Sequence, residues 1–310
     1  MASSYKIGVD GGGTKTECIL IDETGTVLAR HLAPGCNPSV VGPDQARLIV
    51  TDALRTLLAT SNPPRAPLKI SATHIYSAGN RVFWRETAAT LTDFGQVFTA
   101  DDSYPVLELA TNGQPGLVLH GGTGSFVAAR GPDGTVHYAG GIGWRFGDPG
   151  SGYDLGRRAI ARALLELQGW SPLSRVGPTV REHTQLGESA DAAAITRFFY
   201  THPDPNRQIA ALAPALLRLA SEGDPLATQL VAESTDGLLA LATRVATKLF
   251  PGTALDTLPA GLSGPILTHP VVVQSLVPRS PLSLASRSPL SLAPVQGTPI
   301  EGVRRLLMRA

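Results

Sequence analysis

The stretch IGVDGGGTKT, residues Ile7–Thr16, joins a short apolar run to a glycine-rich turn and places Asp10 between the two. A second apolar run, Cys18–Ile21, follows at once, so the pattern predicts a strand, a turn and another strand. Glycines let successive backbone N–H groups converge on an anion, because no side chain obstructs them. A carboxylate at the strand end suits a hydrated divalent cation beside bound phosphates. We therefore expect a site for a nucleoside triphosphate.

Two other glycine motifs are excluded, and one alternative stays open. The GxxxxGK[ST] spacing of a P-loop is absent, and a dinucleotide-binding GxGxxG would open a helix, whereas a strand-like run follows here. An ordinary hairpin without a ligand is the alternative. The same pattern occurs again, however, since the apolar run Leu117–Leu119 leads through Gly121–Gly124 into a second strand at Ser125–Ala129. This duplication favours phosphate binding.

Composition limits the class of protein. The 310 residues suffice for about two domains. A net charge of +1 offers no electrostatic reason to expect nucleic acid or a membrane as a partner. Cys18 and Cys36, the only cysteines, are too few for a cysteine-rich zinc site or a cysteine-ligated cluster within one chain. The first ten residues lack the features of a secretory signal, and no apolar run approaches the ~20 residues that span a bilayer. We expect a cytoplasmic protein.

Strand and helix signals alternate along the chain, which indicates an α/β fold. The breaker cluster Asn112–Gly116 predicts a domain boundary. The C-terminal segment Gly302–Arg309 is favoured as a solvated, amphipathic basic helix, and the repeated SPLSLA at 280–285 and 288–293 shows strand-like alternation without assignable chemistry. The predicted strands are Lys6–Asp10, Glu17–Asp22, Val27–Leu32, His74–Ala78, Gln96–Thr99, Leu117–Leu119, Ser125–Ala129 and Val136–Tyr138. The predicted helices are Pro43–Ala59, Arg85–Thr92, Pro105–Thr111, Tyr153–Leu167, Ile209–Ala220, Pro225–Leu249 and Pro270–Leu276.

Several polar residues outside the glycine turns could carry chemistry. Asp101 and Asp102 follow a predicted strand, where a carboxylate can accept a proton from a hydroxyl that attacks phosphorus. Adjacent acids also favour a helix N-terminus, which is the alternative. Asn37 suits recognition of a polar ligand or forms a plain turn before Pro38. Asp148 can contact a ligand, cap the helix that follows, or do both.

Five motifs in this order carry a resemblance: DGGGTKT at 10–16, GCNP at 35–38, ADDS at 100–103, HGGTGS at 120–125 and GWRFGDPGSGYDLG at 143–156. Through them the chain resembles the BadF/BadG/BcrA/BcrD group of the actin-like ATPase superfamily. Within it, the chain looks most like the N-acetylglucosamine kinases and bacterial glucosamine kinases.

The resemblance implies an α/β fold of two ribonuclease-H-like (actin-like ATPase) domains with a central cleft for ATP and sugar. Residues 1–114 would form the first domain, together with a C-terminal helix near 298–310 that crosses back onto it. Residues 115–297 would form the larger second domain, with a helical insertion. The resemblance also implies a homodimer.

The same resemblance implies that ATP and Mg²⁺ are bound by the glycine turns. Asp10 would hold Mg²⁺ through water, and Gly261 would lie near the adenosine. The implied phosphate contacts are Gly12, Gly13, Thr14 and Lys15 in the first turn and Thr123 and Gly124 in the second.

For the sugar, the resemblance implies one base and several binding residues. Asp102 would activate the 6-hydroxyl, because the family pattern of a polar residue, Asp and a small residue fits Asp101-Asp102-Ser103. The implied sugar contacts are Asn37, Asp102, Gly122, Thr123 and Asp148.

Departures from the family pattern surround the implied sugar site. Relatives carry Trp where Ile142 stands, Glu where Pro149 stands and a second Gly where Leu262 stands. N-acetylglucosamine, glucosamine, glucose and N-acetylmannosamine therefore stay open as acceptors. Two other functions are alternatives: a sugar or nucleotide sensor without catalysis, and an ATPase activator of a dehydratase, which the shortage of cluster cysteines disfavours.

Overall fold

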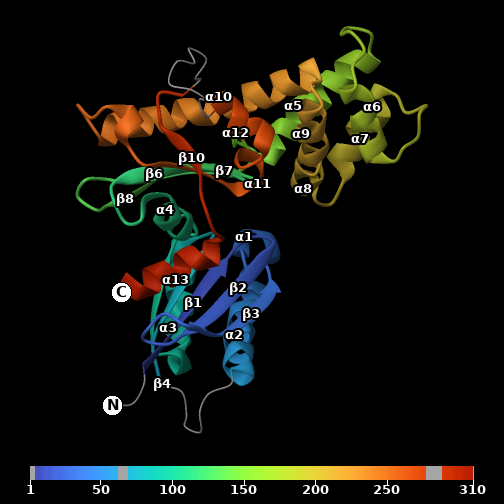
Figure 1. Cartoon of the computed structure of the whole chain (residues 1–310). Coiled ribbons are helices and arrows are strands. Elements are labelled where there is room, and N and C mark those ends of the chain that lie inside the picture. The colour runs from blue at the N-terminus through green and yellow to red at the C-terminus, as the bar shows by residue number, and fades with distance from the viewer. Residues whose placement is uncertain (1–3, 62–68, 277–287, 310) are drawn as a thin grey trace. The chain divides into compact units, whose positions relative to one another are not determined.

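The computed structural model describes residues 4–61, 69–276 and 288–309 (Figure 1). The chain divides into two compact units. The first unit contains residues 1–113 and 296–310, and the second contains residues 114–295. The C-terminal segment therefore belongs to the same unit as the N-terminus.

The first unit is built on a five-stranded mixed sheet in the order β3-β2-β1-β4-β5. Its strands are β1 (Ser4–Gly11), β2 (Lys15–Ile21), β3 (Val27–Pro34), β4 (Lys69–Ser77) and β5 (Gln96–Ala100). The first three form an antiparallel meander, whereas β4 runs parallel to β1 and β5 parallel to β4. Because β1, β4 and β5 are parallel, their carboxyl ends lie at one edge of the sheet.

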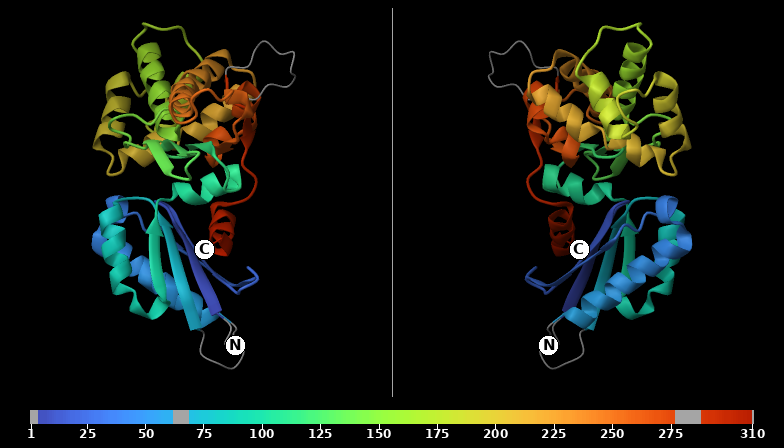
Figure 2. Two further views of the ribbon diagram at one scale, coloured as in Figure 1. Left: turned by 90° about the vertical axis from the view of Figure 1, so that its left-hand side faces the viewer. Right: turned by 90° about the vertical axis from the view of Figure 1, so that its right-hand side faces the viewer.

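Helices cover both faces of this sheet, and the alternation of side chains along β2 explains how. Cys18 and Leu20 belong to the core under α2 (Pro43–Thr60), which also includes Trp84 of α3 (Arg81–Thr90). Ile19 and Ile21 point to the other face, where α13 (Pro299–Arg309) packs beside α4 (Ser103–Thr111). Figure 2 shows α13 along the sheet from two further sides.

Two glycines bring α13 close to its neighbours. A methyl group at Gly8 of β1 would lie 2.4 Å from Cγ1 of Val303, a fully buried residue of α13. A methyl group at Gly302 would lie 2.1 Å from the carbonyl oxygen of Pro105 in α4. The interpretation of the C-terminal helix as a solvated cap is therefore wrong, because one face of α13 is part of the core.

The second unit repeats the sheet of the first, in the order β10-β9-β6-β7-β8. Its strands are β6 (Gly116–Gly121), β7 (Ser125–Arg130), β8 (Val136–Gly140), β9 (Ala260–Ser263) and β10 (Leu292–Pro294). β6, β7 and β8 form the antiparallel meander, and β9 and β10 extend the sheet in parallel. The predicted α/β duplication is thereby confirmed. β10 begins within the second SPLSLA segment; the first, 280–285, lies outside the described residues.

A large helical layer packs on the sheet of the second unit. The helix expected at Ile209–Ala220 is interrupted near Leu212, because Pro214 has no N–H to continue the preceding helix. The segment Val176–Thr184 is a further helix that the sequence analysis did not predict. The helices are α5 (Gly152–Leu167), α6 (Val176–Thr184), α7 (Ala192–Thr201), α8 (Pro205–Ala210), α9 (Ala213–Ser221), α10 (Pro225–Leu249), α11 (Gly264–Leu267) and α12 (Pro270–Leu276). Within the described part of the chain, no helix is both long and apolar enough to cross a bilayer.

Candidate functional site

The first glycine hairpin connects β1 to β2 and packs against the loop that follows β3. The Gly12 N–H donates to the Lys15 carbonyl at 2.9 Å, and the Gly12 carbonyl accepts from the Cys36 N–H at 3.0 Å. A methyl group at Gly35 would lie 2.3 Å from the Gly13 carbonyl oxygen, so only glycine fits there. The residues at the hairpin tip, Gly13, Thr14 and Lys15, are exposed. A rigid base with an exposed tip fits the predicted contacts with phosphates.

The positive charge of this hairpin, on Lys15, takes part in a solvent-exposed ion pair. Lys15 Nζ lies 3.0 Å from Glu17 Oε2, and the Lys15 side chain is 50% exposed. An ion pair as exposed as this contributes little to stability, because water screens it. Lys15 can therefore exchange Glu17 for a bound phosphate at small cost.

Asp10 ends the central part of β1 and lies in an environment that disfavours its charge. Burial raises the pKa of its carboxyl to about 7, and the negative charge of Asp102 adds to the effect. A cation beside this carboxylate would replace the lost hydration. Among the described residues no group of three or more His, Cys, Asp or Glu side chains gathers. Mg²⁺ needs no such group, since one or two carboxylates, phosphates and water usually complete its shell. Asp10 fits the predicted Mg²⁺ position.

The neighbouring acids Asp101 and Asp102 differ in their contacts. Arg81 Nε donates to Asp101 Oδ1 at 2.8 Å, and Arg81 Nη2 pairs with the other carboxylate oxygen. Asp102 occupies the N-cap position of α4, but its side chain makes no capping hydrogen bond. Burial raises the pKa of Asp102 to about 6, and the charge of Asp101 contributes. Both acids thus lie at the N-terminus of α4, as the alternative expects, but the Asp102 carboxylate makes no capping hydrogen bond there.

Strand register brings Asp10 and Asp102 to the same edge of the sheet. Asp10 is opposite Tyr76 across the β1–β4 pair, and Tyr76 is opposite Ala100 across the β4–β5 pair. Both acids thus lie at the carboxyl ends of parallel strands, with Ser77 of β4 between them. Ligands of open α/β sheets bind at such ends.

Asn37 lies next to this edge, in the loop after β3. Its Oδ1 accepts from the Ser39 N–H at 3.0 Å and thereby caps the short helix α1 (Pro38–Val41). A methyl group at Gly79, after β4, would lie 3.0 Å from the same oxygen. The plain turn considered before Pro38 is therefore the N-terminus of a short helix instead. The amide nitrogen of Asn37, which makes no hydrogen bond within the described residues, is left to donate to a ligand.

The second hairpin, between β6 and β7, is fixed to the N-terminus of α5. The Gly122 N–H donates to the Gly124 carbonyl at 2.9 Å, and the Gly122 carbonyl accepts from the Gly152 N–H at 2.7 Å. The Thr123 carbonyl accepts from the Tyr153 N–H at 3.3 Å. Thr123 itself is exposed at the tip. Like the first hairpin, this turn combines a fixed base with an exposed tip.

Asp148 lies against this second hairpin. A methyl group at Gly124 would lie 3.0 Å from Asp148 Oδ2. Asp148 is 5% exposed, and its Oδ1 has no hydrogen-bond partner within the described part of the chain. Burial raises the pKa of Asp148 to about 6, although the Gly143 N–H counteracts it. The N-cap of α5 is Ser151, so the capping role considered for Asp148 is wrong. A buried carboxylate oxygen without a partner leaves a place for a hydrogen-bond donor.

A hydrogen-bond network holds the backbone that follows Asp148. Ser234 Oγ of α10 donates to Asp154 Oδ2 at 2.8 Å and accepts from the Gly150 N–H at 3.3 Å. Asp154 also binds Arg157 and Arg158 at 2.8 and 2.9 Å. The sequence analysis missed Ser234, because it lies 80 residues from Asp154 on a helix without a motif.

The third glycine segment adjoins the second hairpin. Gly261 is buried within β9, opposite Val118 of β6. Gly264 follows β9 with φ +83°, and a methyl group there would lie 2.4 Å from the Gly121 carbonyl oxygen. Of the two glycines, Gly264 therefore makes the close backbone approach, whereas Gly261 is enclosed by neighbouring strands. The contact predicted between Gly261 and adenosine stays a prediction.

His120 packs within the second unit, which agrees with the structural role expected for it. Its ring stacks on Phe126 with centroids 4.8 Å apart, and Nδ1 lies 3.3 Å from Ser263 Oγ. Burial lowers the pKa of His120 to about 4, so the ring is neutral near pH 7. A neutral, stacked imidazole supports the packing of β6 against β9.

Residues 7–252, more than half of the chain, match the model of the BadF/BadG/BcrA/BcrD ATPase family. The chain belongs to this family. The resemblance noted in the sequence is thereby confirmed.

Three known proteins illustrate the relationship. An N-acetyl-D-glucosamine kinase of Dictyostelium discoideum is 24% identical over 265 residues, which cover 80% of this chain and 81% of the relative. An N-acetylmuramic acid/N-acetylglucosamine kinase of Clostridium acetobutylicum is 23% identical over 235 residues, covering 74% and 75%. A crystal structure from Chromobacterium violaceum, described as a candidate N-acetylglucosamine kinase, is 29% identical with a TM-score of 0.73 and 98% coverage of both chains. The fold of that structure agrees with the two repeated sheets.

Proposed function

We propose that this family member is an ATP-dependent sugar kinase that phosphorylates the 6-hydroxyl of an amino sugar, N-acetylglucosamine or glucosamine. The kinase names of the related proteins support the reaction class. The observation that carries the proposal is the Asp102 carboxylate, which is desolvated and makes no capping bond, whereas Arg81 engages Asp101. Asp102 lies at the same strand-end edge as Asp10, where a phosphate-bound cation would be held.

The glycine hairpins are the proposed contacts with the triphosphate. In the first unit these are Gly12, Gly13, Thr14 and Lys15, and in the second unit Thr123 and Gly124. Exposed backbone N–H groups and the Lys15 ammonium stabilise negative charge on a phosphoryl group during transfer. Mg²⁺, held near Asp10 through water, would neutralise phosphate charge when bound.

Asp102 is the proposed general base. Its carboxylate would accept the proton of the 6-hydroxyl as that oxygen attacks the γ-phosphorus. Partial burial keeps it more basic than an exposed aspartate, yet a pKa of about 6 leaves it ionised at pH 7.5. That combination suits a base at neutral pH.

The sugar contacts are proposed on chemical grounds within each unit. The Asn37 amide can donate to a sugar oxygen, and in the second unit the Asp148 carboxylate can accept from a sugar hydroxyl. The unsatisfied Oδ1 of Asp148 supports this assignment. Ile142 and Pro149, which lie in the Asp148 loop, are the proposed reason why the acceptor can differ from that of relatives.

The test is a coupled assay of ADP release with MgATP and each of four sugars: N-acetylglucosamine, glucosamine, glucose and N-acetylmannosamine. We expect ADP release to depend on one of the amino sugars, with the product phosphorylated at the 6-position. ATP hydrolysis that no sugar stimulates would contradict the kinase proposal and favour a sensor without catalysis.

A further inference from the structure

Glu17 is a carboxylate beside the first glycine hairpin to which the proposed reaction gives no role. It lies on β2, opposite Asp10 of β1, and its side chain is only 10% exposed. Two cations share it: Lys15 Nζ lies 3.0 Å from Oε2, and Arg30 Nε lies 3.5 Å from Oε1. One nearly buried acid thus holds two basic side chains at the start of β2.

The register of the sheet explains this grouping. Residues two apart in a strand share a face, so Lys15 and Glu17 point to the same side of the sheet as Ile19. Ile19 is opposite Arg30 across the β2–β3 pair. Residues that are opposite each other lie on one face, and a long side chain reaches the diagonal neighbour, which for Arg30 is Glu17. The backbone therefore places the three charged side chains next to one another.

The two cations differ in what else they can reach. Lys15 adjoins the exposed tip of the hairpin, is 50% exposed itself and is a proposed contact with phosphate. Arg30 lies on β3, further along the sheet from the hairpin, and contacts the other oxygen of Glu17. Lys15 can therefore turn to a phosphate while Arg30 stays with Glu17.

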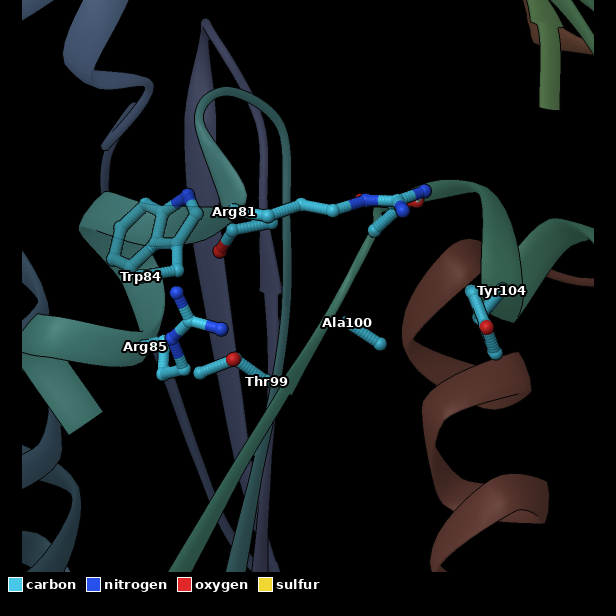
Figure 3. A pocket seen from close by; sticks show the side chains of 8 residues that line it. Arg81, Trp84, Arg85, Thr99, Ala100 and Tyr104 are labelled. Atoms are coloured by element: carbon cyan, nitrogen blue, oxygen red, sulfur yellow. Dashed lines mark hydrogen bonds and ion pairs between the residues drawn. The ribbon is translucent and has the colours of Figure 1, made fainter. Parts of the chain in front are cut away.

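The other charged groups near this edge do not replace Arg30. In Figure 3 the Arg81 side chain extends from α3 over a pocket at the ends of β4 and β5, and its guanidinium pairs with Asp101. Asp10 is an acid: burial chiefly raises its pKa to about 7, and the charge of Glu17 adds to the effect while Lys15 opposes it. Among the described residues, Arg30 is therefore the cation that remains with Glu17 if Lys15 leaves.

We propose that Glu17 and Arg30 are positioning residues that set the affinity for the nucleotide: Glu17 holds Lys15 before the nucleotide binds, and Arg30 retains Glu17 when Lys15 moves to a phosphate. This inference rests on the phosphate contact proposed for Lys15. The phosphate must displace Glu17 from Lys15, so the acid and the nucleotide compete for one ammonium group. Removal of the acid releases Lys15, whereas removal of Arg30 leaves Lys15 as the remaining partner of the acid.

The test measures, by calorimetry at low salt, the affinity of the full-length protein for the Mg²⁺ complex of AMPPNP, an ATP analogue that is not hydrolysed. We expect Glu17→Gln to bind it about threefold more tightly than the wild type and Arg30→Gln about threefold more weakly, which is the size of a partly exposed ion pair. Arg30→Lys should restore part of the loss, because the positive charge returns. Residues that only support the fold would not change the affinity in opposite directions, so weaker binding by Glu17→Gln would overturn the inference.

A double-mutant cycle tests whether Glu17 acts through Lys15. In the Lys15→Gln background, Glu17→Gln should change the affinity less than about twofold. An equal gain in both backgrounds would mean that Glu17 acts through its own charge and would overturn the exchange of partners. Asp52→Asn and Arg55→Gln, which remove the two halves of an exposed ion pair on α2, are the matched controls and should leave the affinity unchanged.

Binding and turnover separate this inference from the kinase proposal. If the wild type binds the analogue but no sugar stimulates ADP release, the kinase proposal fails, and the opposite signs of the Glu17 and Arg30 variants still decide the inference. If sugar-dependent turnover is present but Lys15→Gln binds the analogue as tightly as the wild type, the inference is overturned and the kinase proposal stands.

Discussion

Asp102, the proposed base, is a side chain whose environment disfavours its charge and so destabilises the fold. Its carboxylate is desolvated, is close enough to Asp101 and Asp10 to sense their charges, and makes no capping hydrogen bond. The Arg81 guanidinium neutralises Asp101, whereas no arginine or lysine among the described residues pairs with Asp102. Burial and the neighbouring charge raise the pKa of Asp102. Perturbed pKa values of this kind are common at functional sites.

The raised pKa of Asp102 predicts a pH dependence of catalysis. A base must be ionised, so kcat/KM should fall about tenfold per pH unit as the pH drops below about 6 and be level above it. Steady-state rates between pH 5 and 8.5, at saturating MgATP, measure this. A profile that continues to rise well above pH 7 would contradict the assignment of Asp102 as the group responsible.

The same shift predicts that Asp102→Asn stabilises the fold. The folded-state pKa of about 6 lies above the ordinary value of 3.8, so the wild type loses stability as the pH rises from about 4 through 6. At pH 8 the variant should be more stable by about 1–2 kcal/mol, and at pH 4 the difference should nearly vanish. Urea unfolding at both pH values provides the measurement. A variant that is less stable at pH 8 would show that the carboxylate is stabilising.

At the scale of elements, α10 positions the loop that carries Asp148. Ser234 joins this helix to Asp154 of α5 and to the backbone at Gly150. Loss of its hydroxyl leaves a buried N–H and a carboxylate oxygen short of one partner.

Ser234→Ala should therefore lower the free energy of unfolding by about 1–2 kcal/mol and raise KM for the sugar more than it lowers kcat. Thr243→Ala, on the same helix, serves as the control, because within the described ranges the Thr243 hydroxyl bonds only the Leu239 carbonyl. An unchanged KM for the sugar in Ser234→Ala would show that the network does not position the loop.

The close contact between α13 and α4 predicts the effect of adding a methyl group at Gly302. Gly to Ala inside a helix is ordinarily stabilising by about 0.5–1 kcal/mol. At Gly302 the added methyl would instead lie 2.1 Å from the backbone oxygen of Pro105, which cannot rotate away. Gly302→Ala should destabilise the protein by about 1–3 kcal/mol in urea unfolding. A gain in stability would mean that α13 does not pack as closely as described.

Particular residues show how far sequence reasoning reaches. The repeated glycine hairpins and their flanking strands are local patterns, so they predicted both meanders and the α/β duplication. The break at Pro214 follows from a local signal, a proline without an N–H, that was overlooked within an otherwise helical pattern. The helix Val176–Thr184 was missed, because its weak helix signals depend on burial against other helices. The roles of Arg81 and Ser234 depend on contacts between segments distant in the chain, which no local spacing reveals.

At the scale of the whole molecule, the two units have sheets with the same strand arrangement. Each has a meander of three strands extended by two parallel strands, so each glycine hairpin directly follows the central strand of its sheet. The hairpin in each unit is stabilised by a different neighbour: the loop after β3 in the first and the N-terminus of α5 in the second. The duplicated fold thus supplies two phosphate-binding candidates from a single pattern.

The main proposal for this protein is that Asp102 is the base of a sugar kinase. Its most direct test is sugar-dependent ADP release at pH 7.5 by the wild type and by Asp102→Asn, with nucleotide affinity measured alongside and the exposed Asp52→Asn as control. We expect Asp102→Asn to lose at least about a hundredfold in kcat while it binds MgATP normally, and Asp52→Asn to be unaffected. Near-normal turnover in Asp102→Asn would contradict it.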